Sequence, residues 1–278
     1  MKKELTLTAE KLVLRYQKEV KTVRIVRWVM LAAYVLMLVV TAANITFPRA
    51  VIAVILFVLV MKVLQGAETQ QFVELQQVLN QNCDAVKYTE IMERLLEAPG
   101  KEQNAIRMSY AKGLYYAGRF AEAQEALNSF YLQRPSVGTA VLYRSIAFGC
   151  CMEQEDLDGA RREREEVAQL LGRVKPAERG PAHAQLQIMD AELALAEERY
   201  DEFFPQQTQV LQAAQLPLQR VSATYRLALG KLVMGEDAEA RQLLEQVVEN
   251  GGTCFMAAEA ANLLEEFALP EKAAEDEA

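Results

Sequence analysis

Two long apolar runs, separated by a short polar stretch, lie between residues 25 and 64. No charged residue occurs from Trp28 to Ala43 or from Ala50 to Met61. A helix needs about 20 apolar residues to cross a bilayer, with a lower limit of about 17. The stretch 44–49 is long enough only for a reversal. The pattern predicts a two-helix transmembrane hairpin with spans at 25–47 and 49–64. The alternative is a buried hairpin in a soluble core, which fits less well because apolar residues occupy every face.

Charge is divided unevenly around this hairpin. Residues 1–27 contain eight basic and three acidic side chains, whereas residues 65–278 contain 20 basic and 35 acidic ones. Arg49 is the only basic residue between the spans. Because basic residues near membrane spans stay on the cytoplasmic side, we expect both termini and the acidic part to be cytoplasmic. The four cysteines form no C-x-x-C pair, and we expect them to be reduced, mostly buried thiols, which agrees with a reducing compartment. We expect a bacterial inner membrane; a reversed topology is the alternative.

The N-terminal segment 1–24 is predicted to be a basic amphipathic helix. Its apolar residues recur at spacings of three and four, which places them on one face: Leu5, Ala9, Leu12, Tyr16, Val20 and Val23. Two interpretations stay open. The helix either lies along an anionic membrane surface and then turns into the bilayer, or leads directly into the first span.

Residues 65–267 contain one helical pattern after another and no alternating strand pattern. The stretch 104–135 has Ala111 in its first helix, Gly118 in a turn, Phe120 after the turn, Ala123 in a second helix and Pro135 at the end. It resembles a tetratricopeptide repeat, although Arg107 stands where that family often has Trp. The pattern recurs at 223–252, and weaker copies lie between the two at 141–172 and 182–214. Their small-residue position is taken by Ala160, Phe203 and Ala240. We predict an all-α chain in which the hairpin precedes a tetratricopeptide-like α-solenoid, followed by an acidic disordered tail at 268–278.

No motif for catalysis or cofactor binding is found. The chain has no phosphate-binding glycine loop, no nucleophile elbow and no zinc-protease motif. His183 is the single histidine and has no partner at metal-ligand spacing. The acidic balance disfavours nucleic acid, which binds clustered Lys and Arg. We therefore predict a protein that is not an enzyme, with no cofactor and no metal.

Binding is the function that remains. In tetratricopeptide proteins the first helices of successive repeats line a groove that takes peptides or helices. That resemblance implies a protein or peptide partner at five residues: Met108, Lys112, Tyr115, Tyr116 and Tyr225. The predicted function is a membrane-anchored, cytosol-facing adaptor or scaffold. The alternative is a non-catalytic accessory subunit of a membrane enzyme or transporter, assembled through the hairpin. The partner's identity and the oligomeric state stay open.

Overall fold

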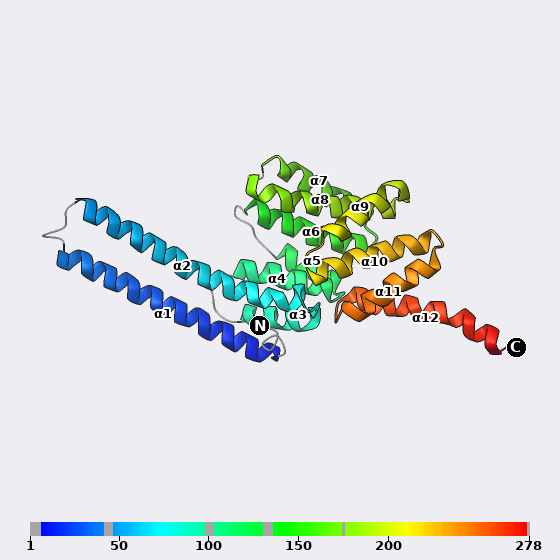
Figure 1. Cartoon of the computed structure of the whole chain (residues 1–278), viewed down its shortest axis with the longest axis horizontal. Coiled ribbons are helices and arrows are strands. Elements are labelled where there is room, and N and C mark those ends of the chain that lie inside the picture. Colours follow the sequence, from blue (N-terminus) through cyan, green and yellow to red (C-terminus); the bar gives the residue numbers. More distant parts are fainter. Residues whose placement is uncertain (1–6, 42–46, 98–102, 130–135, 174–175, 277–278) are drawn as a thin grey trace. The chain divides into compact units, whose positions relative to one another are not determined.

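The computed structural model describes residues 7–41, 47–97, 103–129, 136–173 and 176–276, and over these residues it contains twelve helices and no strand. The predicted all-α class is therefore confirmed. The chain divides into two compact units, Met1–Gln77 and Val78–Ala278. Figure 1 shows their helices. The boundary lies beyond the predicted one at residue 64, because a single helix runs without a break past Gly66.

The first unit consists of two long helices, α1 (Ala9–Thr41) and α2 (Phe47–Asn80). They run antiparallel (Figure 1), and contacts in reverse sequence order join them: Tyr34 with Phe57 at 4.2 Å between ring centroids, Arg27 Nη2 with Glu68 Oε2 at 3.0 Å, and Tyr16 with Phe72 at 6.3 Å. Helix α1 is uninterrupted across residue 25. The N-terminal segment therefore leads directly into the apolar run. A helix that lay flat along the membrane surface would need a turn before the bilayer, and α1 has no turn at residue 25. The turn between the helices, 42–46, is outside the described residues.

The second unit contains α3 (Ala85–Glu97) and then four helix–turn–helix units. These are α4 (Gln103–Tyr116) with α5 (Phe120–Asn128), α6 (Val137–Glu153) with α7 (Leu157–Leu171), α8 (Pro176–Ala196) with α9 (Tyr200–Ala213), and α10 (Pro217–Val233) with α11 (Asp237–Asn250); α12 (Phe255–Asp276) follows. Each helix from α3 to α12 packs against the next one along the chain. In addition, α4 packs against α6, and α6 packs against α8.

The four inter-helix turns share one backbone geometry. A residue with left-handed φ ends each first helix: Gly118 (φ 76°), Glu155 (60°), Glu198 (59°) and Gly235 (72°). The next residue donates its N–H five positions back, as Arg119 does to the Leu114 carbonyl at 2.9 Å and Glu236 to Lys231 at 2.9 Å. This is the Schellman arrangement, which satisfies carbonyls that a helix end leaves unpaired. The same hydrogen bonds recur at Asp156 and Arg199.

The predicted small-residue positions are all fully buried. Ala123, Ala160, Phe203 and Ala240 are each 0% exposed, and each stands five residues after the left-handed turn residue. Three alanines let the paired helices approach closely. Phe203 fits because Gly230, on the following helix α10, leaves room for its ring. The repeat pattern read from the sequence thus corresponds to four structurally equivalent units, and their assignment to the tetratricopeptide class stays a prediction.

The beginning of the second unit lies against the turn between α11 and α12. Thr253 donates its N–H to the Cys83 carbonyl at 3.0 Å, and its hydroxyl hydrogen-bonds Asp84 Oδ1 at 3.0 Å. The Cys254 thiol lies 3.2 Å from the same carbonyl. Gly252, at φ 55°, has no room for a side chain because the Cys83 carbonyl oxygen is there. The helices therefore wrap around far enough to bring the turn between α11 and α12 against the residues just before α3.

Helix α12 continues to Asp276, within the stretch 268–278 where the sequence predicts a disordered tail, and Ala, Glu and Lys in this stretch are strong helix formers. Two prolines lie inside helices: Pro205 in α9, which begins at Tyr200, and Pro181 in α8, which begins at Pro176.

Candidate binding pocket in the helical repeat unit

The first helices of the four helix–turn–helix units face a common pocket of about 300 Å³. Helices α4, α6, α8 and α10 supply most of its lining, and α9, the α9–α10 connection and the end of α2 supply the rest. This is the side that the repeat pattern predicted for binding. Its size is at the lower end of what small-molecule pockets occupy.

Three of the five predicted site residues line this pocket. Lys112, Tyr115 and Tyr116 come from adjacent turns of α4 and are half-buried. The two tyrosine rings meet edge to face at 5.0 Å, and the Lys112 ammonium lies 5.9 Å from the centre of the Tyr116 ring. Gly149 on α6 makes room for Tyr115, because a Cβ there would lie 2.7 Å from the ring.

The other two predicted residues do not reach the pocket. Met108 is 3% exposed and packs in the core formed by α4, α5 and α6, in contact with residues such as Ile146. Tyr225 is 2% exposed, and its hydroxyl donates to Glu259 Oε2 at 2.8 Å on α12. Its ring also lies 6.3 Å from that of Phe255. Both residues are therefore part of the packing between helices.

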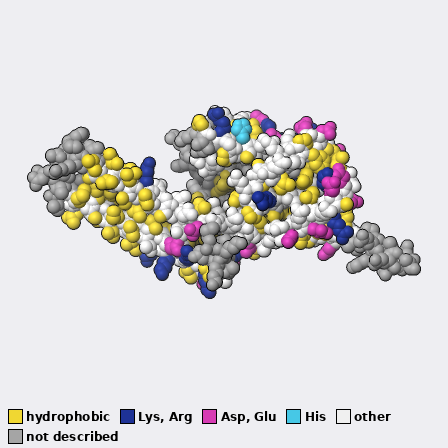
Figure 2. Space-filling view, in the orientation of Figure 1, with side chains coloured by type: hydrophobic (Ala, Val, Ile, Leu, Met, Phe, Trp, Pro, Cys, Tyr) yellow, Lys and Arg dark blue, Asp and Glu magenta, His cyan; other side chains and the backbone are white. Residues whose placement is uncertain are grey.

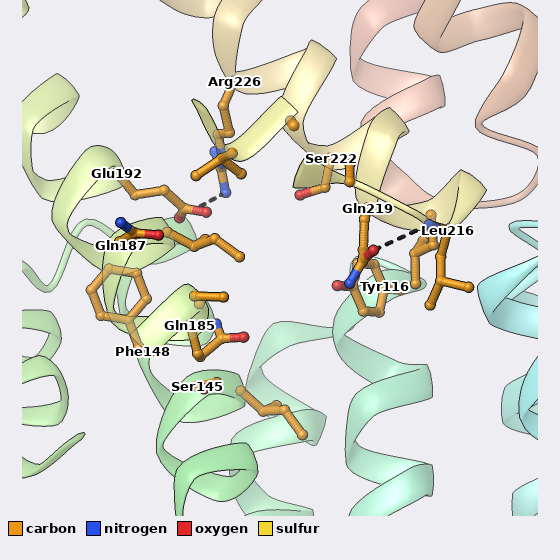
Figure 3. A pocket seen from close by; sticks show the side chains of 18 of the residues that line it. Tyr116, Ser145, Phe148, Gln185, Gln187, Glu192, Leu216, Gln219, Ser222 and Arg226 are labelled. Carbon is orange, nitrogen blue, oxygen red and sulfur yellow. Dashed lines mark hydrogen bonds and ion pairs between the residues drawn. The ribbon is translucent and has the colours of Figure 1, made fainter. Parts of the chain in front are cut away.

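A charged cluster that the sequence analysis missed lies at one side of the pocket. Arg226, one residue after Tyr225, ion-pairs with Glu153 and lies 3.4 Å from Glu192 Oε2 through its Nη2. Glu192 is 7% exposed, and its Oε2 accepts no hydrogen bond. In Figure 3 the Glu192–Arg226 pair lies at the upper left of the pocket and Tyr116 at the right. One guanidinium thus faces two carboxylates, which leaves this side with a net negative charge.

Neutral hydrogen-bonding side chains also line the pocket. Amides and hydroxyls recur around the lining: Asn80, Ser145, Gln185, Gln187, Gln207, Gln219 and Ser222. Three of the amides already make hydrogen bonds. Asn80 Oδ1 accepts from the Lys112 ammonium at 3.0 Å, Gln207 donates to the Ala223 carbonyl at 2.8 Å, and Gln219 Oε1 accepts from the Leu216 N–H at 3.1 Å. Figure 3 shows Gln185 and Gln187 on α8 beside the cavity. The pocket therefore combines a largely apolar lining with amides and hydroxyls, and charged groups lie at two of its sides.

Burial perturbs the ionisable groups of the lining. Desolvation lowers the pKa of Lys112 from 10.5 to about 8. It raises the pKa of Glu192, with Arg226 acting in the opposite direction. Burial also opposes the charge of Arg226, but the carboxylates of Glu192 and Glu153 prevail and hold its pKa above the usual value. Burial raises the pKa of both Tyr115 and Tyr116, so their hydroxyls stay neutral donors.

A sequence signal for the missed cluster existed. Glu192 stands between Ala191 and Leu193 in an otherwise apolar stretch, and Arg226 stands between Tyr225 and Leu227. A charged residue flanked by core residues indicates a buried ion pair, since an isolated buried charge is costly. The four cysteines, by contrast, lie as expected: all are free and buried. His183 is exposed.

Comparison with family models, with curated proteins and with solved structures gives no match for this chain. The site is therefore interpreted from its geometry and chemistry.

Proposed function

We propose that this protein is a membrane-anchored, cytosol-facing adaptor whose helical repeat unit binds a protein or peptide partner. Support for the anchor comes from α2. Among the described residues, Ile52–Asn80 is the one helical segment long and apolar enough to cross a membrane. Its large apolar side chains are exposed at Ile52, Val54, Ile55, Leu56, Val58, Leu59 and Val63. These positions cover more than half of the helix surface, and the remaining side includes Phe57, which stacks on Tyr34 of α1. A bilayer allows such a wide apolar surface, and water disfavours it.

The second helix of the anchor is part of the same proposal. Helix α1 exposes Ile25, Val26, Trp28, Val29, Met30, Val35, Leu36 and Met37. Figure 2 shows hydrophobic side chains gathered along the helix pair. Trp28, 71% exposed, follows Arg27 at the start of the apolar run, where a membrane interface favours an amphipathic ring. The excess of basic residues before this run supports a cytoplasmic N-terminus and repeat unit.

The observation that carries the binding role is the shared pocket of the four first helices. Helical repeats that stack in register present such an inner face to a partner. The anchor then raises the concentration of that partner at the membrane. This role fits the tetratricopeptide resemblance of 104–252, which the adaptor proposal retains.

Site-specific photo-crosslinking in membranes tests this function. A photoreactive residue at Ser222 or Gln185, both in the pocket lining, is expected to give a discrete protein adduct. The same residue at Glu249, exposed on α11, is the control and should give none. If pocket positions give no adduct beyond the control, the inner face does not bind a protein partner.

The accessory-subunit alternative is favoured by one observation, the exposure of the small residues Ala32 and Ala33 on α1. Small residues let transmembrane helices approach one another closely. A photoreactive residue at Ala33 would then crosslink a second membrane protein while Ser222 gives no adduct. The reverse pattern supports the adaptor.

A further inference from the structure

Two opposite charges in the pocket lack full partners. Lys112 donates one hydrogen bond, to Asn80 Oδ1 at 3.0 Å, although an ammonium has three N–H donors. Among the described residues, no carboxylate lies within ion-pairing distance of it. On the other side, the Oε2 atom of Glu192 is buried and accepts no hydrogen bond, and its ion-pair partner Arg226 Nη2 lies 3.4 Å away and is shared with Glu153. A buried acceptor without a hydrogen bond calls for an explanation, such as water or an ion.

The two groups face the pocket from different sides. Both residues belong to its lining. Lys112 is held over the Tyr116 ring, and Figure 3 shows Tyr116 and Glu192 well apart across the cavity. Arg226 does not neutralise the Glu192 side, because it is shared with Glu153. A ligand in this pocket therefore meets a cation at one end and a surplus carboxylate at the other.

We infer that this pocket binds a small zwitterion, a free amino acid or a dipeptide, with its carboxylate on Lys112 and its ammonium on Glu192. Charge-assisted hydrogen bonds of this kind are roughly twice as strong as neutral ones. The neutral amides and hydroxyls between the two charges suit peptide groups and polar side chains. The volume of about 300 Å³ fits a ligand of this size.

The proposal is independent of the adaptor function, because it is tested on the purified full-length chain in detergent with no partner present. Calorimetry and thermal unfolding would be followed with L-glutamine and L-alanyl-L-glutamine, and with their N-acetyl and C-amide forms. We expect at least one free zwitterion to bind with a Kd below about 10 mM, and capping either end to weaken binding at least about tenfold.

Two variants test which residue binds each end of the ligand. In Lys112→Met the C-amide form should bind as well as the free form, and in Glu192→Gln the N-acetyl form should do so, as a double-mutant cycle requires. Lys231→Met is the matched control: Lys231 pairs with Glu236 and Glu239 outside the pocket and should leave binding unchanged. Absence of binding by every free zwitterion, or equal binding of capped and free forms to the unmodified chain, overturns the inference. Circular dichroism of each variant separates loss of binding from loss of fold.

Discussion

Phe203 lies against Gly230, and this pair lets one repeat keep the packing that alanine gives to the other three. A Cβ at residue 230 would overlap the Phe203 ring. Phe203 occurs at the position of Ala123, Ala160 and Ala240, all 0% exposed. The extra volume on α9 is thus matched by a missing side chain on α10.

Gly230→Ala is therefore expected to destabilise the protein. The new methyl group forces the fully buried ring or its helix to move, and overpacking of this kind costs about 1–3 kcal/mol. Urea unfolding of the two proteins measures the difference. Gly138→Ala is the control, since a Cβ at this position of α6 meets nothing within 4 Å. If Gly138→Ala lowered the free energy of unfolding as much as Gly230→Ala does, the packing explanation would be contradicted.

The alanine repeats make a parallel prediction. Ala240→Leu should lower the free energy of unfolding by about 1–3 kcal/mol, because Ala240 is completely buried between helices. Ala238→Leu adds the same atoms to an exposed position of the same helix and should change stability by less than about 0.5 kcal/mol. Equal effects at the two positions would show that helix packing does not depend on the small residue.

The left-handed turns predict a stabilising change. Glu155 is exposed and has φ 60°, a conformation that costs a non-glycine residue about 1 kcal/mol. Glu155→Gly should raise Tm by relieving this strain, whereas Glu155→Ala should not. In the equivalent turn, Gly235 has φ 72° and open space for a Cβ, so Gly235→Ala should lower Tm through backbone strain alone. Differential scanning calorimetry measures all three. An increase in Tm for Gly235→Ala would disprove the common turn geometry.

The pH dependence of stability tests the burial of Lys112. Its pKa is lowered from 10.5 to about 8, so between these values the unfolded chain binds more protons than the folded one. The contribution of Lys112 to the free energy of unfolding must then rise as the pH increases from about 8 to 10.5. Below pH 8 the folded protein holds a poorly solvated ammonium, and Lys112→Met should be more stable by on the order of 1–3 kcal/mol.

The advantage of Lys112→Met should shrink as the pH rises from 8 to 10.5. Denaturant unfolding at several pH values measures it. Lys231→Met is the comparison, and its effect on stability at neutral pH should have the opposite sign. Hydrogen bonds to Glu236 and Glu239 raise the pKa of Lys231, so its removal should lower stability at neutral pH. A constant difference between Lys112→Met and the unmodified protein would show that this amine is fully solvated.

Membrane association is tested on α2. Leu56, 58% exposed, lies in the middle of the apolar run. Arginine at the centre of a transmembrane helix costs about 2.5–3.5 kcal/mol, so Leu56→Arg should shift the protein from the membrane fraction toward the soluble fraction. Val248→Arg places the same charge on an exposed position of α11 and should leave the distribution unchanged. Flotation in a density gradient gives the comparison. An unchanged distribution for Leu56→Arg would count against insertion at this position.

The sequence anticipated the helical pairs because their signals are local. Gly118 and Gly235 mark turns that need left-handed φ, and the small residues that follow mark close helix packing. It anticipated less well which side chains on the first helices face inward. Met108 and Lys112 are one turn apart, but neighbouring helices cover Met108 and leave Lys112 at the pocket. That difference depends on crossing helices and not on spacing along one helix.

By itself the sequence determined the all-α class, the apolar stretch of α2 and the positions of the four repeated turns, because each follows from residues close together in the chain. Only the tertiary structure decided that Cys83 meets Thr253 and that Arg226 joins Glu153 and Glu192. These contacts span from 34 to 170 residues, and no local periodicity encodes them. The pocket and its two unmatched charges exist because the helices wrap around and bring such distant residues together.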